Sequence, residues 1–225
     1  MIMQFVVSSY PGAVVLLLIT GIAAVLFGLF MLLDFLKNKN MHHLLWALAF
    51  FVLFIAGIVL IFTNDYSLLL SPLVAALAAL IPVGIAAGLY FVVFEEKNKL
   101  YGYIYLLFVI VMVILIGITK AVDSPGASAT VMVAHIPSGL SIILLPIYTT
   151  YKTKETDWKA LLITIGGIVV SIAGMLLALF TIGAADIVLI LTLLPIVLLI
   201  AAVFFAFGML IPEKWAFSIP GLTSK

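Results

Sequence analysis

The chain of 225 residues contains no cysteine and no arginine, and only 8% of its residues are charged. The absence of cysteine excludes disulfides, thiol redox chemistry and cysteine-ligated metals. A net charge of +1 argues against nucleic-acid binding, which needs a concentrated basic face. A soluble domain carries about 25% charged residues. The chain therefore has too little polar surface to coat a water-soluble globule.

Apolar residues take up most of the sequence instead. They make up 67% of the chain, and the mean hydropathy is +1.45. They form seven continuous runs, each near the length of about 20 residues that a helix needs to cross a bilayer. Lipid offers no partner for free backbone groups, so each run is expected to be helical. We predict an all-α, polytopic integral membrane protein: one transmembrane domain over residues 1–225, built as a seven-transmembrane-helix bundle with spans at 12–36, 43–62, 68–94, 101–118, 130–151, 160–180 and 187–211.

The lysines predict the orientation of this bundle. Nine of the ten lie in alternate gaps between the runs: Lys37, Lys39, Lys97, Lys99, Lys152, Lys154, Lys159, Lys214 and Lys225. Lysine accumulates in cytoplasmic loops, so the amino terminus is expected outside and the carboxyl terminus in the cytoplasm. The three tryptophans fall near the same interface, and we place Tyr90, Tyr101 and Tyr105 in its aromatic belt. All ten basic residues are lysine, and cysteine is absent. This composition suggests that the protein lies in a prokaryotic plasma membrane.

A weak internal echo links the two halves of the chain. Ile55-Ala56-Gly57 precedes Phe62-Thr63, and Ile172-Ala173-Gly174 precedes Phe180-Thr181. Such an echo is expected if spans one to three and five to seven are parallel duplicates, a plan used by some transporters. Chance similarity between apolar segments is the alternative.

His135 is the main candidate for a functional residue within a span. An ionisable group inside a membrane helix is a functional suspect by default, and Pro137 frees backbone carbonyls close by. The alternative is a histidine near the interface that bonds to a neighbouring helix or to water. Ser138 lies three residues on, so a Ser–His pair on one face is possible, but no third partner completes a catalytic site. We assign no catalytic residue.

The remaining ionisable residues predict no metal or cofactor site. His42 and His43 are adjacent and diverge around the helix, so they would chelate one metal poorly. Asp34 lies three residues before Lys37 and is interpreted as its ion-pair partner near the interface. No carboxylate lies in the central part of a span, which disfavours proton pumps and voltage sensors.

Small residues predict close helix packing. Gly84 and Gly88 form a Gly-x-x-x-Gly pair, and Gly167 and Gly174 lie on one stripe of span six. Small side chains let membrane helices approach closely. We expect these glycines to pack within the bundle, with a homodimer face as the alternative.

Two functions fit these features. The first is a non-enzymatic membrane protein, receptor-like or an assembly subunit, which binds an apolar or lipid-like ligand or a membrane partner, including a second copy. The second is a transporter or channel for a small neutral solute, because spans three, five and seven carry prolines that would kink them around a path. Residues proposed for the ligand site or path are His135, Pro137, Ser138, Ser141, Ser171, Thr192 and Pro195.

Overall fold

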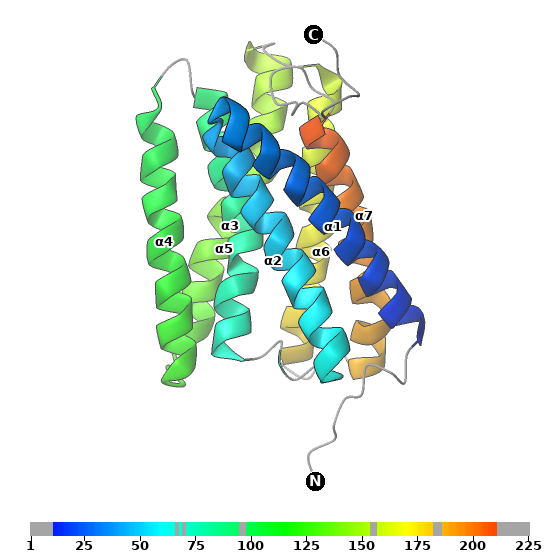
Figure 1. The fold of residues 1–225 in the computed structure, drawn as a ribbon. Coiled ribbons are helices and arrows are strands. Elements are labelled where there is room, and N and C mark those ends of the chain that lie inside the picture. The colour runs from blue at the N-terminus through cyan, green and yellow to red at the C-terminus, as the bar shows by residue number, and fades with distance from the viewer. Residues whose placement is uncertain are drawn as a thin grey trace.

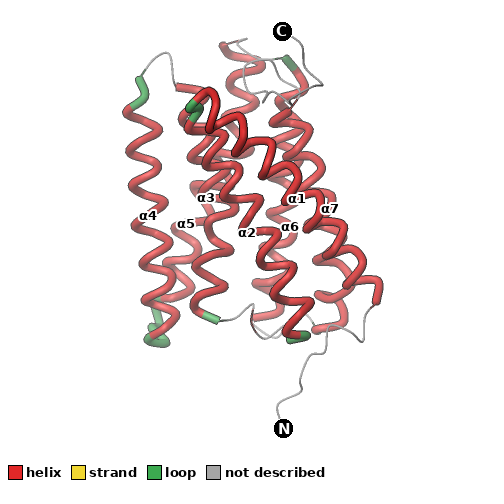
Figure 2. The backbone as a smooth tube through the Cα atoms, in the orientation of Figure 1, coloured by secondary structure: helices red, strands yellow, loops and turns green. Residues whose placement is uncertain are grey.

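Seven long α-helices lie within the residues that the computed structural model describes, which are 11–65, 68, 71–94, 98–153, 157–181 and 186–210. They are α1 (Pro11–Asn38), α2 (Met41–Thr63), α3 (Pro72–Phe94), α4 (Leu100–Ala121), α5 (Ala127–Ile147), α6 (Leu161–Thr181) and α7 (Ile187–Leu210). A π-helical turn, η3 (Tyr148–Thr153), extends α5, and a 3₁₀ turn, η4 (Trp158–Ala160), precedes α6. Figure 2 shows loops confined to the two ends of the helices.

All seven helices are long and apolar enough to cross a membrane. Large apolar side chains cover the outside of the bundle; Leu107 and Met175 are each 63% exposed. In water so much exposed apolar surface would favour aggregation, whereas in a bilayer it faces the lipid chains. The prediction of an all-α bundle with seven membrane spans is confirmed.

Several helix boundaries differ from the predicted ones, most of all at the start of α3 and at both ends of α5, and α4 ends at Ala121 rather than at residue 118. The third helix begins at Pro72 rather than at residue 68, because proline suits the first turn of a helix, where the N–H has no intrahelical partner. The fifth begins at Ala127 rather than at Thr130, and its α-helical part ends at Ile147. The wider turn η3 begins at Tyr148, two residues after Pro146, which has no N–H to donate to the helix.

Six of the helices close a ring around the bundle axis. Helix α1 packs on α2 and α7, α2 on α3, α3 on α5, α5 on α6, and α6 on α7. The remaining helix, α4, lies outside this ring against α3 and α5 (Figure 1). Exchanging α1–α3 with α5–α7 reproduces the six ring contacts, which is the pairing expected of a parallel duplication.

One end of the bundle collects most of the described lysines. The helices alternate in direction, so the ends of α1, α3 and α5 meet the starts of α2, α4 and α6 there, at the top of Figure 1. We call this the lysine-rich end; among the described residues it carries Lys37, Lys39, Lys99, Lys152 and Lys159, while Lys120 lies at the opposite end.

Among the described residues one large apolar core reaches all seven helices, and a smaller apolar cluster lies between α6 and α7. Trp46, in the second turn of α2, is fully buried in this core, and its indole Nε1 donates a hydrogen bond to the carbonyl of Ile85 at 3.1 Å. Gly88 makes room for the indole, since a Cβ there would collide with the ring. A Cβ at Gly84 would meet the carbonyl oxygen of Leu45 at 3.3 Å. The face of α3 that carries these two glycines is therefore covered by α2.

Candidate functional site

A buried ion pair joins α1 to α2 at the lysine-rich end. His43 Nδ1 lies 2.6 Å from Asp34 Oδ2, and the two side chains are 0% and 2% exposed. Asp34 was predicted to pair with Lys37; among the described residues its ion pair is with His43 instead. The prediction was wrong because it considered only neighbours on one helix, whereas the α1–α2 turn brings the next helix against Asp34.

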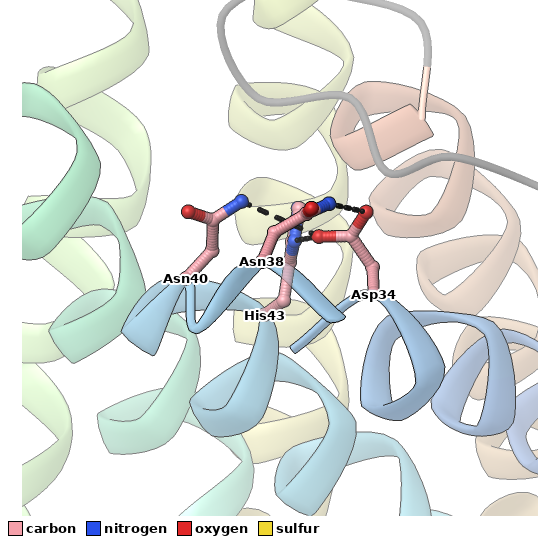
Figure 3. Close-up of polar contacts among 4 residues, drawn as sticks. All are labelled: Asp34, Asn38, Asn40 and His43. Atoms are coloured by element: carbon pink, nitrogen blue, oxygen red, sulfur yellow. Dashed lines mark hydrogen bonds and ion pairs between the residues drawn. The ribbon is translucent and has the colours of Figure 1, made fainter. Parts of the chain in front are cut away.

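The same carboxylate holds the turn between the two helices. Asn38 Nδ2 donates to Asp34 Oδ1 at 2.8 Å, and Asn40 Nδ2 donates to Oδ2 at 3.3 Å (Figure 3). Between these two asparagines Lys39 adopts a left-handed conformation with φ of 60°, and its N–H donates to the carbonyl of Phe35 at 2.7 Å. We call Asp34, Asn38, Asn40 and His43 the turn cluster. Its bonds offset the cost of burying a carboxylate and define the path of the turn.

His42 links the turn cluster to the core. Its ring lies edge-on to His43, with centroids 4.2 Å apart, and to Trp46 at 5.2 Å. His42 is only 5% exposed. The two adjacent histidines therefore face different groups: His43 contacts Asp34, while His42 lines a cavity next to the turn cluster.

The cavity has a volume of about 140 Å³ and is lined by polar and apolar side chains. We call it the lysine-lined cavity. Lys39, Met41 and His42 come from the α1–α2 turn and the start of α2, Phe91 from the last turn of α3, and Lys99 and Tyr103 from the start of α4. The Phe91 and Tyr103 rings meet edge to face at 5.1 Å. Three separate elements therefore build the cavity at one end of the membrane spans.

A second cavity lies inside the ring, between α2, α3, α6 and α7. It is lined by apolar side chains, among them Phe50, Ile85 and Phe205, and its volume is about 20 Å³. That is room for roughly one water molecule, and a cavity without polar partners stays dry. The described residues therefore leave no space here for a bound solute.

Hydroxyl groups of α3, α4 and α5 meet in a buried group of their own. The hydroxyls of Tyr105 and Ser138 lie 2.8 Å apart, and Ser138 donates to the carbonyl of Ala134 at 2.6 Å. Ser141 lies 3.4 Å from the Tyr90 hydroxyl. The rings of Tyr90 and Tyr105 stack with centroids 4.3 Å apart. Tyr105 was placed in the interfacial belt, which is wrong: it is 9% exposed and directed into the bundle.

The other residues proposed for a path do not meet. His135 Nδ1 donates to the carbonyl of Val131 at 2.9 Å, so the imidazole is engaged within its own helix and does not pair with Ser138. Ser171 and Thr192 are exposed, and each donates to a carbonyl one turn earlier. Pro137 is exposed, whereas Pro195 is buried. Ser138 and Ser141, on the same helix, are the two whose hydroxyls reach the tyrosines of α4 and α3, and Ser141 also donates to the carbonyl of Pro137 at 2.7 Å.

The two glycines singled out on α6 differ in their surroundings. A Cβ at Gly167 would clash with Ile142 of α5 at 2.6 Å, so close approach of the two helices depends on this glycine. Nothing lies within 4 Å of a Cβ at Gly174 among the described residues. Gly174 therefore has no comparable contact there.

The sequence contains a signal that indicates the turn cluster. Asp34, Asn38, Asn40 and His43 lie within ten residues around a helix–helix junction, and ionisable groups beside apolar runs need partners. Among the described residues no group of three or more histidines, aspartates or glutamates is placed to hold a metal ion.

Comparison of the chain with known protein families, with curated proteins and with solved structures finds no match.

Proposed function

We propose that this membrane protein binds an amphiphilic, lipid-like ligand, with the polar part of the ligand in the lysine-lined cavity. The observation that carries the proposal is the lining of that cavity. His42, Lys39 and Lys99 offer hydrogen-bond donors, while Met41 and Phe91 offer an apolar wall. An amphiphile at the end of the membrane spans presents both kinds of surface.

The size of the cavity supports a headgroup rather than a whole ligand. Pockets that enclose drug-sized molecules measure about 300–1,000 Å³, and this one measures about 140 Å³. The apolar part of the ligand would then lie outside the cavity, along the lipid-facing surface of the bundle. We further propose that the protein lies in a prokaryotic plasma membrane with its lysine-rich end in the cytoplasm, because of the lysine distribution.

A cavity-filling variant tests the function. We expect the wild-type protein to retain an amphiphile after exchange into a delipidating detergent, detected by native mass spectrometry. Met41→Phe enlarges a lining side chain and should abolish retention. Ile104→Phe makes a similar change at a position 56% exposed on α4, next to Tyr103 but outside the lining, and should leave it intact. No retention by the wild type, or equal retention by both variants, would refute the proposal.

Transport of a small neutral solute is the second candidate. The ring contacts, which match a duplicated three-helix unit, and prolines inside α3 and α7 favour it. The path would run between α2, α3, α6 and α7 and would require the helices to separate, because the cavity there holds about 20 Å³. Solute flux into liposomes that contain the purified protein, blocked by Ala202→Phe at the cavity wall, would favour transport over binding.

A further inference from the structure

His42 is the most deeply buried polar side chain among the described residues that line the lysine-lined cavity. It is 5% exposed, whereas the two lining lysines and Tyr103 are exposed. Within the described part of the chain its interactions are ring contacts, and neither ring nitrogen has a hydrogen-bond partner there. A buried polar group without a hydrogen bond is unfavourable, because it has lost its contacts with water. The imidazole therefore needs a partner in the cavity that it borders.

The aromatic side chains packed on His42 do not supply this partner. Its ring centroid lies 4.2 Å from that of His43 and 5.2 Å from that of Trp46, and both contacts are edge-on. The Nδ1 atom of His43 is engaged by Asp34, and the indole N–H of Trp46 donates to the carbonyl of Ile85. These two rings hold the imidazole in place and leave its ring nitrogens for a molecule in the cavity.

The chemistry of the imidazole indicates what that molecule carries. A neutral imidazole has one N–H donor and one acceptor nitrogen, and a protonated imidazole has two donors. A hydroxyl donates and accepts through one atom, so it complements the ring in either state. We infer that the polar part of the ligand carries a hydroxyl group that hydrogen-bonds to His42. This inference rests on the proposed function, because it names the headgroup of the amphiphile.

The rest of the lining suits a short polyol. The cavity measures about 140 Å³, whereas a single water needs only about 10–15 Å³ of such volume. Met41 and Phe91 form an apolar wall that would contact the carbon atoms of the headgroup while His42 bonds to a hydroxyl. The glycerol of a monoacylglycerol presents both kinds of surface. A soluble polyol presents the same hydroxyl chemistry without an acyl chain.

The turn cluster orders the backbone around His42 before a ligand binds. Asp34 accepts a hydrogen bond from Asn40 and pairs with His43, and these two residues flank His42 in the chain. The backbone N–H of His43 also donates to the carbonyl of Asn40 at 3.0 Å. A group that is already ordered loses less entropy on binding. His42 is thus held ready to bond to a hydroxyl.

The test compares two oleate esters with the same carbon skeleton, 1-monooleoylglycerol and propyl oleate. Each is titrated into the full chain as a mole fraction of the detergent micelle, and binding is followed by thermophoresis. Only the glycerol ester has hydroxyls, and we expect it to bind about tenfold more tightly, which corresponds to one hydrogen bond of about 1.4 kcal/mol. His42→Phe should remove this preference, because phenylalanine keeps a ring without polar atoms. His42→Gln should keep it, because the amide also donates and accepts.

Two controls separate loss of the hydrogen bond from loss of the fold. His135→Phe removes an imidazole that does not line the cavity, and it should leave the tenfold preference unchanged. The chain has three histidines, so NMR signals of isotope-labelled imidazoles can be assigned to His42 through its glutamine variant. In the wild-type protein, 1-monooleoylglycerol should shift the ring signals of His42, and propyl oleate should not.

Equal binding of the two esters by the wild type would overturn the inference and leave the proposed function standing. A preference that persists in His42→Phe would also overturn the inference, because the hydroxyl would then be bound elsewhere. Binding of neither ester would overturn it as well, and together with no retained amphiphile it would remove the proposed function itself. Displacement of 1-monooleoylglycerol by glycerol would support the hydroxyl site and indicate a soluble source.

Discussion

His43 Nδ1 and Asp34 Oδ2 lie 2.6 Å apart, with both side chains out of contact with solvent. A carboxylate and an imidazole buried together at a helix–helix junction stabilise each other only while both are present. Together with Asn38 and Asn40 they hold the turn that presents Lys39 and His42 to the lysine-lined cavity. The ligand site that we propose thus depends on a structural pair that does not line it.

Asp34→Asn should destabilise the protein strongly. The substitution keeps the shape of the side chain but removes the charge that accepts hydrogen bonds from Asn38, Asn40 and His43. We expect a loss of about 3 kcal/mol and a clearly lower melting temperature in detergent. Asp123→Asn is the matched control, since Asp123 is exposed at the opposite end, and it should change stability by less than about 0.5 kcal/mol. Similar melting temperatures for the two variants would argue against a structural role for the pair.

Gly88→Ala should disturb the core around Trp46. A Cβ at Gly88 would collide with the indole, so either α2 or the ring must move and the bond from Trp46 to Ile85 is strained. Overpacking of this kind costs about 1–3 kcal/mol. Gly174→Ala serves as the comparison, because no neighbour within 4 Å opposes it and alanine favours a helix by about 1 kcal/mol over glycine. Thermal unfolding of both variants would measure the difference, and a Gly88→Ala protein as stable as the wild type would contradict the packing described.

The Tyr105–Ser138 bond should couple α4 to α5. A double-mutant cycle with Tyr105→Phe and Ser138→Ala isolates the interaction between the two hydroxyls, which lie 2.8 Å apart. Hydrogen bonds between membrane helices contribute about 0.6 kcal/mol on average, and we expect a coupling of that order. Tyr101→Phe, at a ring 51% exposed, should show no coupling to Ser138→Ala. Zero coupling for Tyr105 would mean that its hydroxyl finds another partner of equal strength.

The absence of cysteine allows the orientation to be measured with single introduced thiols. Lys152→Cys lies at the lysine-rich end, and Ser128→Cys lies near the other end of the same helix; both positions are exposed. In intact cells a membrane-impermeant maleimide should label Ser128→Cys, whereas Lys152→Cys should react only after the membrane is opened. The reverse pattern would place the lysine-rich end outside and contradict the predicted topology.

Hydropathy and the spacing of polar stops were enough to predict seven helices and most of their ends to within two residues. This succeeded because a membrane span must satisfy its own backbone hydrogen bonds, so apolar length alone decides where a helix lies. The late start of α3 at Pro72 is explained by one local preference of proline. Local sequence also marks the α1–α2 turn, where Asn38, Lys39 and Asn40 interrupt two apolar runs.

The identity of side-chain partners was decided by the tertiary arrangement. Asp34 meets His43 rather than Lys37, and Tyr105 turns inward to Ser138, because helices α2 and α5 happen to cover those faces. Nearly every residue of a span is apolar, so the sequence carries almost no periodic signal for which face points inward. The hydropathy of each residue is enough to predict which segments lie in the membrane. Contacts between helices depend instead on how the seven segments pack together. For that reason the chain alone predicts a membrane bundle, and only the packed helices reveal the cavity and the carboxylate that orders it.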